Sequence, residues 1–287
     1  MASRLFSVLK RLLVISRPVL WVNTIGTTIT GMWLAGFLFT WEIIPILIWV
    51  TFPFNLLIYG INDIFDQETD NINARKGGYE GAHIYPNEVK PIWIAVLATN
   101  LPFLIFFAIT LPWQATAWMV AYSLFFLFYS APPLRFKARK YLDALSNTDY
   151  AFPLAFVPLA LGREPMWLAV AGLMAWSIAK HAYDAIQDIP QDSDTGIVTT
   201  AVHLGPKNTA HWATFWWAVS TVLFALVNIP VAIVNALIAG YLVFGIYKTP
   251  TPEKAHDLYK YSIAFPYVAG AVAGVQLVAG IMWGVYP

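Results

Sequence analysis

The chain has 287 residues, of which 59% are hydrophobic and only 11% are charged. About a quarter of the residues in a soluble domain are charged, so most of the outer surface of this protein is expected to face lipid. The formal net charge of +1 does not indicate a nucleic-acid partner, and we predict none. Because the sequence contains no cysteine, disulfides, thiolate metal sites and a cysteine nucleophile are excluded.

Apolar segments of spanning length run through the whole chain. A helix that crosses a bilayer needs about 20 mostly apolar residues, and breaks at charges, proline and glycine predict nine such helices. The predicted segments are Pro18–Phe39, Ile43–Asp66, Pro91–Ile109, Trp113–Ala131, Leu142–Leu161, Met166–Asp188, Thr209–Val227, Pro230–Tyr247 and Ser262–Val285. No small-x-small cleavage site follows a short apolar core, which favours a retained first helix over a cleaved signal. We therefore predict an all-α integral membrane protein, a single domain over residues 1–287, with nine transmembrane helices in a bundle.

The distribution of basic residues supports this count. If the N-terminus is cytoplasmic and the helices alternate in direction, cytoplasmic segments hold all but two of the 17 Lys and Arg residues. The exceptions are Arg163, which falls outside, and Lys180, which lies within a helix. This bias follows the positive-inside rule and predicts that the N-terminus is cytoplasmic.

The acidic residues form two clusters, Asn62–Asp70 and Asp184–Asp194. Each cluster ends an even-numbered predicted helix and opens a longer cytoplasmic loop. Such matching placement indicates a diverged internal duplication, in which two pseudo-repeated four-helix units are followed by one further helix.

The spacing within the first cluster places its carboxylates on one helix face. Asp63, Asp66 and Asp70 stand at i, i+3 and i+7. Asn55 and Tyr59 continue this face deeper into the membrane, which makes both candidates for substrate binding.

The second cluster contains an i, i+4 pair, Asp184 and Asp188. Pro190 is expected to stop the helix near Ile189, which places Asp192 in the following loop.

Carboxylates this close repel one another, and each costs roughly 2.5–3.5 kcal/mol at the centre of a bilayer helix. A shared Mg²⁺ removes both objections, because this ion binds through one or two carboxylates and keeps its other positions for waters and phosphate oxygens. Two facing clusters could thus hold Mg²⁺ around a diphosphate. The candidate counter-charges for the diphosphate are Arg75, Lys76, Arg135, Lys137 and Lys180. The alternative is a solvated acidic loop face that pairs with local lysines.

At these residues the chain resembles the UbiA superfamily of intramembrane prenyltransferases. The family motif N-D-x-x-D-x-x-x-D is matched by Asn62–Asp70, and its D-x-x-x-D motif by Asp184–Asp188. Tyr129–Lys137 is similar to the family's Y-S-x-P-P-L-R-x-K segment, and Thr199–Gly205 to its T-x-x-x-x-x-G segment. The resemblance covers essentially the whole chain and implies helices around a central cavity.

A narrower resemblance is to the lycopene elongases of C50 carotenoid synthesis. It rests on Pro53–Leu56, Tyr59–Asp63 and Arg75–Ala82. It implies that dimethylallyl units from dimethylallyl diphosphate are added to the ends of lycopene, in the cell membrane of a prokaryote, with the active-site loops in the cytoplasm.

The resemblance also implies the roles of individual residues. The metal ligands would be Asn62, Asp63, Asp66, Asp70, Asp184, Asp188 and Asp192. The catalytic set would be Asp63, Asp66, Asp184, Asp188, Lys180 and Tyr129. Mg²⁺ and basic residues would draw charge onto the leaving diphosphate, and the allylic cation would be attacked by a terminal alkene of the acceptor. The new cation then loses a proton or captures water, with His181, Asp149 and the released diphosphate as alternative bases.

Other polar residues have two interpretations. Asn23 and Asn147 are predicted either to line the cavity or to bond across helices, and His181 either belongs to the site or bonds to a neighbouring helix. Asp143 follows a basic run and is expected to pair with Arg139 or Lys140 rather than to bind metal.

Two rival functions remain open. An ion-coupled transporter would also carry intramembrane acids, but it would place them near the midplane rather than at helix ends beside Arg and Lys. A prenyltransferase for a quinone, haem or chlorophyll precursor would differ only in the acceptor. The sequence does not identify a protein partner.

Overall fold

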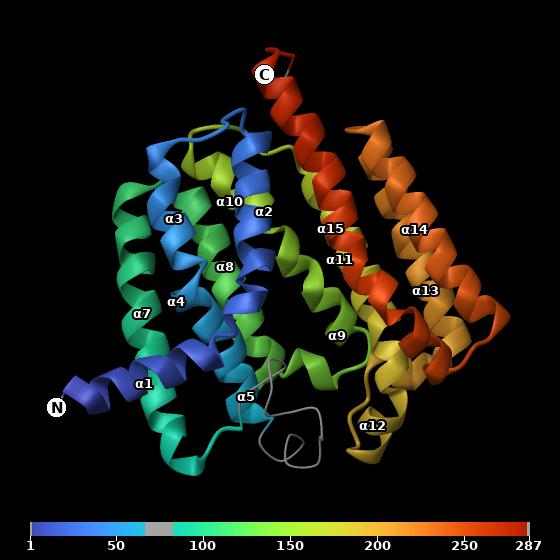
Figure 1. Ribbon diagram of the computed structural model, residues 1–287, viewed down its shortest axis with the longest axis horizontal. Coiled ribbons are helices and arrows are strands. Elements are labelled where there is room, and N and C mark those ends of the chain that lie inside the picture. The colour runs from blue at the N-terminus through green and yellow to red at the C-terminus, as the bar shows by residue number, and fades with distance from the viewer. Residues whose placement is uncertain (1, 67–82, 286–287) are drawn as a thin grey trace.

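The computed structural model describes residues 2–66 and 83–285. Within these ranges every regular element is a helix, and extended backbone pairs only in an isolated bridge between Arg139 and Val198. Most of the long helices stand side by side in one bundle, and α1 (Ala2–Ile15) lies across one end of it (Figure 1). The all-α class predicted from the sequence is confirmed.

The helices fall into two runs along the chain. The first run contains α1, η1 (Pro18–Leu20), α2 (Trp21–Leu34), η2 (Trp41–Ile43), α3 (Ile44–Trp49), α4 (Phe52–Asn55), the π-helical turn η3 (Leu56–Gly60), α5 (Ile61–Phe65), η4 (Pro86–Glu88), α7 (Val89–Thr110) and α8 (Trp113–Ser130). The second run contains η5 (Phe136–Ala138), α9 (Leu142–Leu145), η6 (Ser146–Ala151), α10 (Pro153–Ala160), α11 (Trp167–Asp184), η7 (Ala185–Asp188), α12 (Ile189–Asp194), α13 (Thr200–Ala225), α14 (Ile229–Lys248) and α15 (Pro252–Met282). All nine predicted segments lie mainly on helical backbone.

Two of the helices begin well before the predicted apolar segments. α13 begins at Thr200, and α15 begins at Pro252. Thr199 and Thr251 cap these helices, because each hydroxyl accepts a hydrogen bond from a backbone N–H in the first turn. A search for apolar length omits such polar first turns. α13 also contains a kink at Gly205, whose φ of 72° suits glycine.

The second predicted segment, Ile43–Asp66, is not one regular helix. The backbone breaks at Thr51, where ψ is −117°, and α4 restarts with Pro53 in its first turn. The Asn55 side-chain amide donates to the carbonyl oxygens of Val50 and Thr51, both at 2.8 Å, and its nitrogen also lies 3.0 Å from Thr24 Oγ1. Asn55 thus supplies hydrogen bonds to the carbonyl groups at the break that precedes Pro53. Its amide nitrogen is used in contacts that stabilise the fold.

Four described helical stretches are long and apolar enough to cross a membrane: Trp41–Phe65, Pro86–Thr110, Ile229–Lys248 and Pro252–Met282. A fifth results if the bent pair Phe6–Ile15 and Pro18–Leu34 counts as one span. Large apolar side chains such as Ile109, Leu237 and Phe244 are exposed on the outer surface. An exposed apolar surface of this extent fits a lipid environment, and the count of nine spans stays a prediction.

The helix α1 is not predicted by the search for spanning segments, because it is short and carries several basic residues. Its side chains Phe6, Leu9 and Leu13 are exposed, whereas Ile15 is fully buried. Arg11 fixes the helix to η4, since its Nε donates to Glu88 Oε1 at 2.8 Å and its Nη2 to Glu88 Oε2 at 2.9 Å. An apolar outer face at the end of a membrane bundle is typical of a helix that lies in the interface plane.

A close contact between α2 and α10 supplies a test of the packing. A Cβ atom at Gly31 would lie 2.6 Å from the Pro153 carbonyl oxygen and 3.0 Å from Val157 Cβ. Gly31→Ala is therefore expected to destabilise the fold by about 1–3 kcal/mol through overpacking. Gly26→Ala, on the same helix with nothing within 4 Å of the added atom, is expected to be neutral or stabilising by about 0.5–1 kcal/mol. Thermal unfolding of both variants in detergent would measure this difference, and equal shifts would contradict the close contact.

Candidate active site

The first acidic cluster follows directly from the π-helical turn η3. A π turn inserts one residue into the helical ladder and is frequent at functional sites. Asp63, on α5, is fully buried, and its Oδ1 lies 2.5 Å from Nη2 of Arg17. The Arg17 guanidinium stands over the Tyr59 ring, 4.6 Å from the ring centroid. Asp63 thus lies beside a cation that also contacts Tyr59.

The other members of the first cluster meet residues from the end of α8 and from η5. Ser130 Oγ donates to Asn62 Oδ1 at 3.0 Å, and Lys137 Nζ approaches the same oxygen at 3.4 Å. Lys137 also forms an ion pair with Asp66. The predicted ligands Asn62 and Asp66 and the predicted diphosphate contact Lys137 therefore lie together.

The second cluster is organised in the same way around Asp184, where α11 ends. Lys180 forms an i, i+4 ion pair with Asp184. Ser262, a fully buried residue of α15, donates to Asp184, and Lys180 Nζ lies 3.2 Å from its hydroxyl oxygen. The sequence analysis does not identify Ser262, because an isolated serine inside an apolar helix carries no pattern.

A contact between α8 and α11 joins the surroundings of the two clusters. Tyr129 Oη lies 3.4 Å from Nε2 of His181. Tyr129 precedes Ser130, which contacts the first cluster, and His181 follows Lys180, which contacts the second. The structure therefore brings together two residues that were predicted separately for the site.

The prediction that Pro190 ends the helix and leaves Asp192 in a loop is wrong. Instead α11 ends at Asp184, η7 covers Asp188, and Pro190 stands in the first turn of the new helix α12, which contains Asp192. Proline fits a first turn, because the N–H that it lacks would have no helical partner there.

Asp192 is partly removed from water. Its burial, with the neighbouring Asp188 charge, raises the pKa of the Asp192 carboxyl to about 6. Its Oδ2 lies 3.4 Å from the Thr199 hydroxyl. A bound cation would favour the charged carboxylate, so a metal at this position is expected to bind less well as the pH falls below this pKa.

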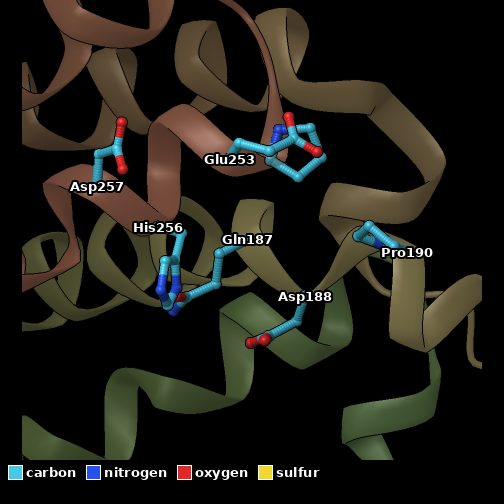
Figure 2. A pocket seen from close by; sticks show the side chains of 7 residues that line it. Gln187, Asp188, Pro190, Glu253, His256 and Asp257 are labelled. Atoms are coloured by element: carbon cyan, nitrogen blue, oxygen red, sulfur yellow. The ribbon is translucent and has the colours of Figure 1, made fainter.

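A pocket with a volume of about 350 Å³ lies beside the second cluster, between η7 and the first turns of α15 (Figure 2). Its lining residues are Gln187, Asp188, Pro190, Pro252, Glu253, His256 and Asp257. His256 Nδ1 lies 3.2 Å from Gln187 Oε1 and links its two walls. Asp188 thus borders an open space at the end of the bundle.

The prediction that Asp143 pairs with Arg139 or Lys140 is wrong. Its two carboxylate oxygens accept from the backbone N–H of Thr200, at 3.0 Å, and from the Thr200 hydroxyl, at 2.5 Å. Asp143 is fully buried, which explains the difference, because a surface lysine could reach it only by losing its own hydration. The residue fixes α9 to the start of α13.

The other described residues predicted to contact substrate or diphosphate are Asn147, Asn23 and Arg135. The Asn147 amide donates to the Asp143 carbonyl oxygen at 2.7 Å, and Asn23 is partly buried on α2. Arg135 adopts a left-handed conformation with φ of 41°, and its buried Nε has no hydrogen-bond partner among the described residues. Asp70, Arg75 and Lys76 lie outside the described residues.

The donor set suits a hard cation. The side chains near the two clusters offer carboxylate and amide oxygens, which are the ligands that Mg²⁺ prefers. In residues 2–66 and 83–285, no three acidic or histidine side chains converge as a complete protein-only metal site.

Comparison with known proteins decides the family. The profile of the UbiA prenyltransferase family matches residues 24–267. The chain belongs to this family. The lycopene elongase/hydratase of Halobacterium salinarum is 34% identical over 96% of this chain and 98% of its own length. The lycopene elongase/hydratase of Corynebacterium glutamicum is 29% identical over 94% of this chain and 97% of its own length. The UbiA resemblance is confirmed, and the protein is a prenyltransferase similar to the lycopene elongases.

Solved UbiA structures share the fold. A UbiA homolog from Archaeoglobus fulgidus bound to DMAPP and Mg²⁺ superposes with a TM-score of 0.68 at 19% identity, and covers 92% of this chain and 99% of its own. A structure of digeranylgeranylglyceryl phosphate synthase gives a TM-score of 0.72 at 19% identity over 95% of this chain and 99% of its own. The ion-coupled transporter, the rival of another class, is not supported by these comparisons.

Proposed function

We propose that this UbiA prenyltransferase transfers dimethylallyl groups from dimethylallyl diphosphate to the ends of lycopene, with Mg²⁺ as cofactor. The similarity to lycopene elongases over nearly the full chain supports the acceptor. The observation that carries the reaction type is the pairing of Asp66 with Lys137 and of Asp184 with Lys180. Each pair would offer one carboxylate to a metal and one ammonium group to a diphosphate.

The basic residues would hold and activate the diphosphate. Lys137 and Lys180 can turn from their carboxylates to phosphate oxygens without leaving the site, because an ammonium group has three donors on a flexible stem. When bound to Asp63, Asp66, Asp184 and Asp188, Mg²⁺ would supply Lewis-acid stabilisation of the leaving diphosphate. Fixed charges of this kind stabilise the leaving group most strongly where water is excluded.

The aromatic residues would protect the allylic cation formed when the C–O bond breaks. Tyr59 is already engaged with one cation, Arg17, and Tyr129 is close to His181. Ring faces of this type stabilise positive charge. The terminal alkene of lycopene would then attack the cation, and the resulting tertiary cation would lose a proton or take up water.

Three groups could accept the proton that the tertiary cation loses in the last step. His181 lies beside Lys180, and Asp149 is buried in η6 with an Oδ1 that has no hydrogen-bond partner among the described residues. The released diphosphate is the third. The ratio of deprotonated to hydrated product for Asp149→Asn and for His181→Gln would distinguish them.

The function is tested by incubating the purified protein in lipid with Mg²⁺, dimethylallyl diphosphate and lycopene. Mass spectrometry is expected to show addition of one and then two five-carbon units, and EDTA is expected to abolish it. Products that also carry water would show hydration. Transfer to a quinone, haem or chlorophyll precursor but not to lycopene would contradict the proposed acceptor and keep the reaction type.

For the membrane topology we propose nine spans in the cell membrane of a prokaryote, with the N-terminus and the acidic clusters in the cytoplasm. The acidic ends of α5 and α12 lie at the same end of the bundle as α1 (Figure 1). Because the sequence contains no cysteine, single cysteines can be labelled without background. An impermeant thiol reagent added to whole cells is expected to label Glu164→Cys and not Asp194→Cys, and the reverse pattern would contradict the orientation.

A further inference from the structure

Arg17 stands at the junction of α1 and η1 in an unusual backbone conformation. Its φ of 50° and ψ of 70° are left-handed, a region that residues other than glycine seldom adopt. Such a conformation persists only where the surroundings fix it, and it is concentrated at functional sites. The residue is flanked by Ser16, which is fully buried, and by Pro18, which begins η1.

The side chain of Arg17 reaches away from its own helix into the first acidic cluster. Only 12% of it is exposed, and Nη2 lies 2.5 Å from Oδ1 of the fully buried Asp63. The guanidinium also covers the Tyr59 ring at 4.6 Å. Tyr59 and Asp63 flank the end of the π-helical turn η3, so a single side chain bridges the turn and the carboxylate that follows it.

The contact is supported from α1 as well. Ile15, fully buried, lies against Gly60 of η3, since its Cγ2 is 3.7 Å from the position of a Cβ at Gly60. The chain therefore reaches Asp63 from the N-terminal side through Ile15 and Arg17. Neither family motif nor spacing in the sequence indicates this connection.

We propose that Arg17 is a positioning residue for Asp63 and fixes the orientation in which this carboxylate meets the metal. The proposal rests on the proposed function. A buried carboxylate whose cation is removed is strongly penalised, and partners that orient a metal ligand typically change metal affinity by about 10- to 100-fold when they are mutated. Arg17 acts in this account through Asp63 and not by contact with the reacting carbons.

A matched control exists on α1, the helix that precedes Arg17. Arg11 also forms an ion pair, with Glu88, in which Nε lies 2.8 Å from Oε1. The two side chains are 33% and 23% exposed, and Glu88 belongs to η4 rather than to the acidic cluster. Arg11→Gln thus removes an ion pair and a contact of α1 without touching the site.

The experiment compares Arg17→Gln, Arg17→Lys and Arg11→Gln. Binding of Mn²⁺ in the presence of inorganic diphosphate is followed by electron paramagnetic resonance, and the transfer rate is measured as a function of Mg²⁺ concentration. Arg17→Gln is expected to weaken Mn²⁺ binding, and to raise the Mg²⁺ concentration for half-maximal rate, by about 10- to 100-fold. Arg17→Lys should restore most of the affinity, and Arg11→Gln should bind Mn²⁺ like the wild type.

Equal Mn²⁺ affinity in Arg17→Gln and Arg11→Gln would overturn the proposal. If Arg17→Gln does not fold, Tyr59→Leu provides the second variant, because it removes the ring under the guanidinium and leaves the ion pair. It is expected to weaken Mn²⁺ binding in the same direction by a smaller factor, and unchanged binding would overturn the proposal. A wild type that transfers no prenyl group, together with weakened Mn²⁺ binding in Arg17→Gln, would reject the proposed function and support the role of Arg17.

Discussion

Asp66→Asn is expected to reduce the rate of prenyl transfer by about 100- to 1,000-fold, the range found when one group that stabilises developing charge is removed. Asp66 ends α5 and forms an ion pair with Lys137. The amide keeps the shape of the side chain and removes the charge, so both the proposed metal contact and the anchor of Lys137 are lost. The initial rate of product formation at saturating dimethylallyl diphosphate measures the effect.

The matched control is Asp194→Asn. Asp194 belongs to the same kind of acidic run, at the end of α12, and is exposed. Its neutralisation is expected to leave the rate within about twofold of the wild type, because exposed charges are screened by water and salt. Equal losses in the two variants would mean that net charge at this end of the bundle, and not the position of Asp66, determines activity.

Lys180→Met has the second largest expected effect, a rate loss of about 100-fold. Lys180 contacts both Asp184 and Ser262. Its removal would leave Asp184 without its nearest cation and the diphosphate without one of its proposed contacts. Ser262→Ala should cause a smaller loss of about tenfold, because it removes one hydrogen bond to a charged group. Both rates are measured after thermal unfolding has shown that the variants are folded.

Lys260→Met is the control for Lys180→Met. Lys260 is an exposed residue of α15 whose ammonium group lies over the Tyr261 ring, 5.1 Å from its centroid. Its replacement removes one exposed positive charge, and we expect no change in the rate because exposed charges are screened by water and salt. A rate for Lys180→Met within a few-fold of that for Lys260→Met would contradict the role of Lys180.

The sequence predicts the helices well where apolar length alone determines them. The predicted segment Trp113–Ala131 and the helix α8, Trp113–Ser130, have nearly the same bounds. Prediction fails where local geometry competes with composition. The second segment breaks before Pro53, where the Asn55 amide bonds to the carbonyl oxygens of Val50 and Thr51. The polar first turns of α13 and α15 extend these helices beyond the apolar window.

The two acidic motifs were found from the sequence because several acids share one local pattern. Ser130 lies within the matched segment Tyr129–Lys137, but the sequence does not show its contact with the Asn62 amide. Ser262 is a single residue far along the chain from Asp184, and no pattern indicates its contact with that carboxylate. Arg17 was counted only as one of the cytoplasmic positive charges. Contacts between helices distant in sequence depend on tertiary packing, which the pattern of residues along a single chain does not show.

The most direct test of the account is a structure of the protein with Mg²⁺ and the thiolodiphosphate analogue of dimethylallyl diphosphate, which does not ionise readily. The account predicts that the diphosphate lies between the two clusters, with metal on Asp63 or Asp66 and on Asp184 or Asp188, and with Lys137 and Lys180 on phosphate oxygens. A diphosphate bound elsewhere, with the ion pairs of Lys137 and Lys180 intact, would contradict it.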